Sequence, residues 1–69
     1  MDDRVPEVFI GPWLRAKGKL PRDVANGADV NEGYLSQLIS GKKVNPKAST
    51  LKRIGDYLGM DWRRLYDRP

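Results

Sequence analysis

Residues Asp23–Gly41 read DVANGADVNEGYLSQLISG, and this stretch predicts two short helices joined by a tight turn. The first helix is expected to run to Asn26 or Ala28, and the second from Glu32 to about Ser40. Apolar residues recur at a spacing that places them on one face of each helix, as burial against a common core requires. The apolar positions of the stretch are Val24, Ala25, Ala28, Val30, Leu35 and Leu38.

The second of these helices has a defined start, a defined end and a polar outer face. Asn31 stands just before it, where its side-chain oxygen can accept from a backbone N–H and cap the helix. Gly41 follows Ser40, where a helix can end in a left-handed turn. Leu35 and Leu38 are three residues apart and are expected to point inward. The residues that then point outward are Glu32, Gly33, Ser36 and Gln37, and those at the edges are Tyr34 and Ser40.

The order and spacing of these features resemble the helix-turn-helix of the lambda-repressor-like family, also called the Cro or XRE family. The family's apolar-Ala pair corresponds to Val24–Ala25, and its turn with the following apolar residue to Asp29–Val30. Its Tyr-Leu-Ser-Gln-apolar run corresponds to Tyr34–Leu38, and its closing Gly-Lys pair to Gly41–Lys42. The resemblance covers about Phe9–Asp67. It implies an all-α fold, a compact bundle of about five short helices with a central helix-turn-helix.

Two positions depart from the family pattern. Asp29 stands where the family usually has Gly, and Asp tolerates the left-handed backbone conformation better than most residues, so the turn is expected to survive. Gly27 lies two positions earlier, which leaves open that the first helix ends there instead. The family's Thr-Gln, whose Gln commonly touches a phosphate, is replaced by Leu20–Arg22. Pro21 suits the first position of a helix, and Arg22 is expected to take over the phosphate contact.

The resemblance implies that the second helix of the motif lies in the major groove of DNA and presents its N-terminal residues to base edges. Gln37 can form two hydrogen bonds with adenine, and Glu32 can accept from the amino group of cytosine. The residues expected to read bases are Glu32, Gly33, Ser36 and Gln37. The residues expected to contact phosphates are Arg22, Asn31, Tyr34, Ser40, Lys42, Lys43 and Lys47. A solvated surface remains the alternative for Glu32 and the lysines, and the edge of the core for Tyr34.

The composition fits a small nucleic-acid-binding domain and argues against several other classes. The 69 residues carry a net charge of +4, and residues 15–22 and 41–53 hold lysine and arginine without any acidic residue. Basic clusters of this kind favour a polyanion such as nucleic acid. There is no Cys and no His, which removes disulfides, the usual zinc ligands and the Cys- or His-based catalytic arrangements. We expect no enzyme activity, no cofactor and no metal.

The sequence also predicts how the chain is divided and where it resides. Met1–Arg4 lacks the apolar run of a signal peptide, and no stretch approaches the roughly 20 apolar residues of a membrane span. We therefore expect a cytoplasmic protein without membrane contact. Residues 1–5 are expected to form a flexible N-terminal arm, and residues 6–69 a single helix-turn-helix domain.

The segment before the motif leaves two alternatives open. The residues with the spacing of one helical face are Val8, Phe9, Trp13 and Leu14. Gly11–Pro12 interrupts this pattern, and a proline inside a helix removes a hydrogen bond and clashes with the preceding turn. The helix therefore either begins near Pro12 or runs over Pro6–Ala16 with a kink. The resemblance places the last three of the four apolar residues in the core.

A fourth helix and a short fifth are expected after the motif. Ser49 is expected to cap the fourth helix. The residues of its buried stripe are Leu51, Ile54 and Leu58. Gly55 beside the stripe allows a close approach of another element, and Gly59 ends the helix. Asp61 then caps a final short helix in which Leu65 faces the core.

These features favour one function and leave a second in competition. The first is a small prokaryotic or phage transcriptional regulator, a repressor, that binds double-stranded DNA at a palindromic operator as a homodimer, at least on DNA. The second is a protein-interaction module on the same fold, such as an antitoxin-type partner. Trp62 and Tyr66 are four apart on the last helix, and they either pack on the core or form a dimer surface.

Overall fold

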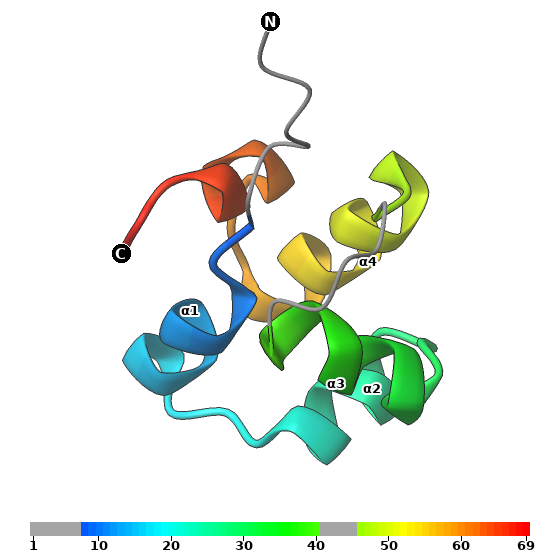
Figure 1. Cartoon of the computed structure of the whole chain (residues 1–69). Coiled ribbons are helices and arrows are strands. Elements are labelled where there is room, and N and C mark those ends of the chain that lie inside the picture. The colour runs from blue at the N-terminus through cyan, green and yellow to red at the C-terminus, as the bar shows by residue number, and fades with distance from the viewer. Residues whose placement is uncertain (1–7, 41–45) are drawn as a thin grey trace, which may run out of the picture.

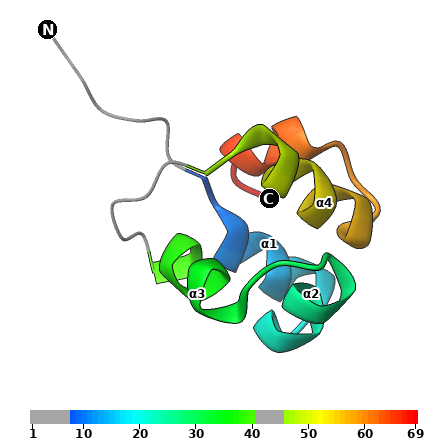
Figure 2. The same ribbon diagram turned by 90° about the vertical axis from the view of Figure 1, so that its right-hand side faces the viewer.

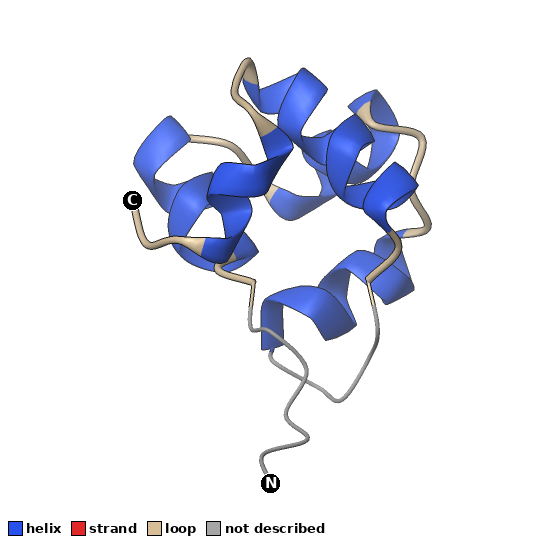
Figure 3. Ribbon diagram, turned by 90° about the horizontal axis from the view of Figure 1, so that it is seen from above, coloured by secondary structure: helices blue, strands red, loops and turns tan. Residues whose placement is uncertain are grey.

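The computed structural model describes residues 8–40 and 46–69, and these residues form four α-helices and one 3-10 helix (Figures 1 and 3). The elements are α1 (Ile10–Lys17), α2 (Pro21–Gly27), α3 (Glu32–Ser40), α4 (Ala48–Leu58) and η1 (Trp62–Tyr66). No strand occurs among the described residues, so the predicted all-α class is confirmed for them. The last of the five expected helices has 3-10 geometry, which leaves four α-helices. The predicted flexible arm, residues 1–5, lies outside the described residues.

Helix α1 accommodates the Gly11–Pro12 pair in its first turn. It begins at Ile10, so Pro12 lies in the first turn, where backbone N–H groups have no partner within the helix. The missing N–H of proline therefore removes no helical hydrogen bond. Val8 and Phe9 precede the helix, so the alternative of a kinked helix over Pro6–Ala16 is wrong.

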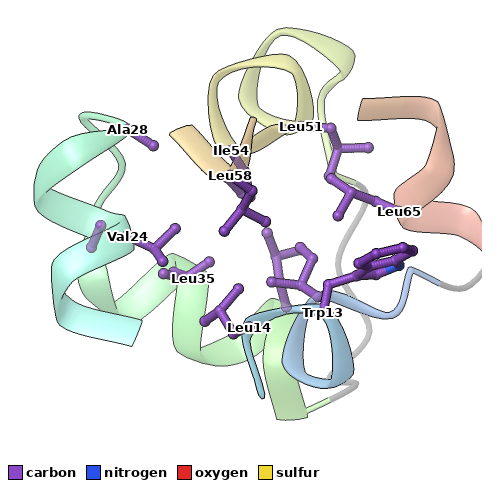
Figure 4. Close-up of a cluster of buried hydrophobic side chains, with 12 residues drawn as sticks. Trp13, Leu14, Val24, Ala28, Leu35, Leu51, Ile54, Leu58 and Leu65 are labelled. Atoms are coloured by element: carbon purple, nitrogen blue, oxygen red, sulfur yellow. The ribbon is translucent and has the colours of Figure 1, made fainter. Parts of the chain in front are cut away.

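The core is formed by side chains from all five elements (Figure 4). Its buried hydrophobic residues are Ile10, Trp13, Leu14, Val24, Ala25, Ala28, Leu35, Leu38, Leu51, Ile54, Leu58 and Leu65. The predicted core positions of the motif are confirmed, except that Val30 is only half-buried. Phe9 is also half-buried, whereas its neighbour Ile10 has an exposed fraction of 0%. Ile10 was not predicted to be in the core, because the family resemblance placed Phe9 there and the helical spacing of this segment did not include Ile10.

Helix α4 places its apolar stripe inward and its glycine against η1. Leu51, Ile54 and Leu58 are buried, as predicted. A Cβ atom added to Gly55 would lie 2.8 Å from the Cα atom of Trp62, so the glycine permits a close approach of η1. The predicted cap at Ser49 is wrong. The helix begins at Ala48, two residues before the start that a cap at Ser49 implies, and Ser49 therefore lies within the first turn.

The start and the end of the described chain are joined by hydrogen bonds. The backbone N–H of Phe9 donates to the carbonyl oxygen of Leu65 at 2.8 Å. The indole Nε1 of Trp13 donates to the carbonyl oxygen of Asp67 at 2.7 Å, and the guanidinium of Arg64 lies 5.3 Å from the centre of the indole ring. Trp13 therefore packs in the core with its indole N–H hydrogen-bonded, as is usual for buried tryptophans.

The predicted cap at Asp61 is confirmed, although the helix it caps is of the 3-10 type. The Asp61 carboxylate accepts from the backbone N–H of Arg63 at 3.0 Å and from its guanidinium Nη2 at 2.9 Å. These hydrogen bonds favour the ionised carboxylate and lower the pKa of Asp61 below its ordinary value. Helix α4 ends just before Gly59, and the cap at Asp61 fixes where η1 begins.

The turn between α2 and α3 contains the left-handed residue that the sequence predicts. Asp29 has φ 56°, and it is the one non-glycine residue with positive φ in the described part of the chain. The Val30 N–H donates to the Ala25 carbonyl at 2.9 Å, and the Asp29 N–H to the Asn26 carbonyl at 3.4 Å. This pair of hydrogen bonds is the Schellman arrangement of a helix end. Helix α2 does end at Gly27, but Gly27 has no positive φ.

Replacing Asp29 by glycine is expected to be neutral or to stabilise the fold by up to about 1 kcal/mol, because glycine adopts positive φ without steric cost. The ends of α1 and α4 carry the same pair of hydrogen bonds around a left-handed glycine. Asp29→Val is expected to destabilise by about 1–2 kcal/mol, because a β-branched residue resists this conformation. Thermal melts of both variants measure the difference, and equal melting temperatures would contradict it.

Candidate nucleic-acid interface

Helices α2 and α3 lie side by side in one half of the molecule, joined by the Asp29 turn (Figures 1 and 2). Leu35 and Leu38 are buried, so one side of α3 faces the core. The four residues predicted to read bases, Glu32, Gly33, Ser36 and Gln37, are all exposed. They occupy positions i, i+1, i+4 and i+5 of the helix, which share one face. The structure therefore presents them together on the side of α3 that faces away from the core.

The N-terminus of α3 is capped as predicted. The Oδ1 atom of Asn31 accepts from the backbone N–H of Tyr34 at 3.0 Å, and the Asn31 carbonyl accepts the first helical hydrogen bond, from Leu35, at 2.9 Å. A side-chain oxygen in this position satisfies one of the free N–H groups at the helix start. Asn31 is exposed, and its side-chain amide nitrogen remains able to donate to an external acceptor.

The residues predicted to contact phosphates differ in how available they are. Arg22 and Lys47 are exposed. Ser40 is exposed too, but its hydroxyl donates to the carbonyl of Gln37 at 3.2 Å and would have to rotate to donate elsewhere. Tyr34 is half-buried and packs against the core, in agreement with its alternative assignment to the core edge. The predicted contacts Lys42 and Lys43, like Gly41, lie outside the described residues.

Arg53 connects α4 to the turn of the motif. Its Nη1 atom donates to the carbonyl oxygen of Asp29 at 3.2 Å. This hydrogen bond joins residues 24 apart in sequence, and it helps to hold the turn in place relative to α4. No local pattern in the sequence predicts it, because the pairing depends on how α4 packs beside α2.

A shallow hollow lies between the starts of α2 and α3. Its lining residues are Leu20, Pro21, Arg22 and Glu32. Leu20 has an exposed fraction of 54% and is the exposed large hydrophobic residue of the described chain. It has no role in the predicted interface. The signal that could have singled it out is its position directly before Pro21, where a helix start favours a polar cap.

Trp62 and Tyr66 form the predicted aromatic pair on η1. Their ring centres are 6.4 Å apart in an edge-to-face arrangement, and both side chains are half-buried against the core. Packing on the core, the first of the two alternatives, is therefore observed for part of each side chain. Both side chains belong to η1, the element that packs against α4, and part of each side chain remains exposed. The dimer surface stays a prediction.

Two further features of the described residues concern metal ions and membranes. The described residues contain no group of three or more acidic, Cys or His side chains able to hold a metal ion. None of the described helices is long and apolar enough to cross a membrane. Comparison with protein-family models, with curated proteins and with solved structures gave no match.

Proposed function

We propose that the chain is a sequence-specific double-stranded DNA-binding protein of the lambda-repressor-like kind, which inserts α3 into the major groove. The observation that carries the proposal is the exposed polar face of α3, presented by a capped helix that follows a left-handed turn. A major groove about 12 Å wide admits one α-helix, and a helix-turn-helix presents the N-terminal part of its second helix to base edges. As a small transcriptional regulator, most simply a repressor, the chain would act by occupying its site.

The chemistry of this face suits direct recognition of bases. Gln37 can donate and accept at once, which matches the N6 and N7 atoms of adenine. Glu32 can accept from the N4 amino group of cytosine, and Ser36 can serve as donor or acceptor. Gly33 has no side chain, so the backbone of α3 can approach the groove closely at this point. Such a glycine costs an exposed helix about 1 kcal/mol relative to alanine, and a close approach offsets that cost.

Positive charge around α3 supports the same proposal. Arg22 is exposed at the start of α2, and Lys47 is exposed just before α4. Lys42 and Lys43 follow α3 in the sequence, within an acid-free stretch. Contacts of this kind position a protein on the phosphates without reading sequence. They also supply the binding energy that depends on salt.

Selection of bound sequences from a random duplex pool is the experiment that tests the proposal. One α3 covers only a few base pairs, and we expect a palindromic consensus bound by two copies of the chain. The two half-sites should lie about one helical turn apart, roughly 34–36 Å. Failure to recover any consensus would overturn the proposal. A single half-site bound by one protein per duplex would overturn only the dimer.

The second candidate function is a protein-interaction module, such as the antitoxin half of a pair. The observation that favours it is the pair Trp62 and Tyr66, whose rings are only half-buried. Aromatic side chains of this kind are enriched at protein interfaces. Recovery of no DNA consensus, together with loss of a protein partner on Trp62→Ala, would favour this function over the first.

A further inference from the structure

Leu20 combines an exposed apolar side chain with an unfavourable helix position. It is a large apolar side chain with an exposed fraction of 54%. It is also the N-cap of α2, where it makes no side-chain hydrogen bond to the helix start. Serine, threonine, aspartate or asparagine would stabilise that position, and leucine is among the least suitable residues there. Residues that break local rules without a structural gain are expected at functional sites.

The surroundings of Leu20 connect it to the proposed DNA-binding face. It shares the hollow between the starts of α2 and α3 with Arg22 and Glu32. Glu32 is the first residue of α3 and belongs to the face proposed to read bases. Arg22 is exposed and is proposed to contact a phosphate. The apolar side chain thus lines the same hollow as a residue proposed to face base edges and a residue proposed to contact the DNA backbone.

We infer that Leu20 contacts the C5-methyl group of a thymine beside the base read by Glu32. This inference rests on the proposed function. Thymine is the one base that presents a methyl group in the major groove, and apolar side chains recognise it by contact. The contact removes the exposed surface of Leu20 from water, which accounts for an apolar residue at a position that favours a polar one. Leu20 is therefore a determinant of specificity that carries no charge and no hydrogen bond.

The experiment removes the methyl group from the DNA and the side chain from the protein, separately and together. Each thymine of the duplex recovered by selection is replaced in turn by deoxyuridine, which lacks only the C5-methyl group. We expect one replacement per half-site to weaken the binding of the native chain about fourfold, the effect of exposing one buried methyl group. Leu20→Ser should bind the thymine and deoxyuridine duplexes equally well. Leu20→Met, which keeps an apolar side chain, should retain sensitivity to the replacement.

The melting temperature separates this role from a structural one. Leu20→Ser supplies a side chain able to cap α2, so its melting temperature should equal or exceed that of the native chain. Deoxyuridine effects that are absent, or equal in the native chain and Leu20→Ser, would overturn the inference while leaving the proposed function intact. So would a consensus without thymine. If no consensus is recovered from the pool, the proposed function fails and the inference fails with it.

Discussion

Replacing Gly55 with alanine is expected to lower the free energy of unfolding by about 1–3 kcal/mol, as overpacking of a well-packed core does. The added Cβ would lie 2.8 Å from the Cα atom and 2.9 Å from the backbone nitrogen of Trp62. These atoms belong to the backbone, so no rotation of a side chain relieves the clash. In an exposed helix the same substitution would stabilise by about 1 kcal/mol, because alanine has the higher helix propensity. Whether Gly55→Ala lowers or raises the melting temperature therefore tests whether η1 packs on α4 as described.

Gly27 provides the matched control for Gly55. A Cβ atom at Gly27 would collide with the aromatic ring of Tyr57, which is a side chain and can be changed. We expect Gly27→Ala to destabilise, and the double variant with Tyr57→Leu to recover part of the loss. Gly55→Ala combined with Trp62→Leu should recover nothing, because the obstructing backbone atoms remain. A rise in melting temperature for Gly55→Ala would show that η1 does not approach α4 this closely.

Replacing Gln37 with alanine is expected to cost about 1–3 kcal/mol of binding free energy on the selected DNA site, and to relax base preference at one position. Gln37 lies one turn beyond Gly33 on the exposed face of α3, so truncation removes its contact without disturbing the core. Its effect on a scrambled duplex should be small, because non-specific binding depends mainly on phosphate charge. Equal weakening on both duplexes, or loss of the folded state, would show that the proposed orientation of α3 on DNA is wrong.

Lysine substitutions should give the opposite pattern. Lys47→Ala is expected to weaken binding to the selected and scrambled duplexes alike, and to lower the salt slope by about one for the lost phosphate contact. Lys42→Ala and Lys43→Ala should behave in the same way. Lys17→Ala is the matched control, because this exposed lysine at the end of α1 is outside the proposed contacts but carries the same charge. Lys47→Ala and Lys17→Ala should change stability by less than about 0.5 kcal/mol, because both side chains are exposed. The same small change is expected for Lys42→Ala and Lys43→Ala.

The sequence predicted most of the local structure of α2, the Asp29 turn and α3, because the deciding interactions there are local. The cap at Asn31 joins residues three apart, and the hydrogen bonds of the left-handed turn at Asp29 join residues no more than five apart. The inward and outward faces of α3 follow from the 3.6-residue period alone. A helix start, a helix end and the choice of buried face are each determined by residues that are close in sequence. The exposure of the candidate base-reading residues was predictable for the same reason.

Only the tertiary structure decided how the helices pack against one another. Ile10 rather than Phe9 enters the core, and the Trp13 indole donates to Asp67, a residue 54 positions away. The contact of Arg53 with the Asp29 turn and the approach of Trp62 to Gly55 likewise join separate helices. Sequence patterns report the period of one element but not the distance between two. That distance is set by the shapes of all the side chains packed between them, because a close-packed interior leaves no room for independent adjustment.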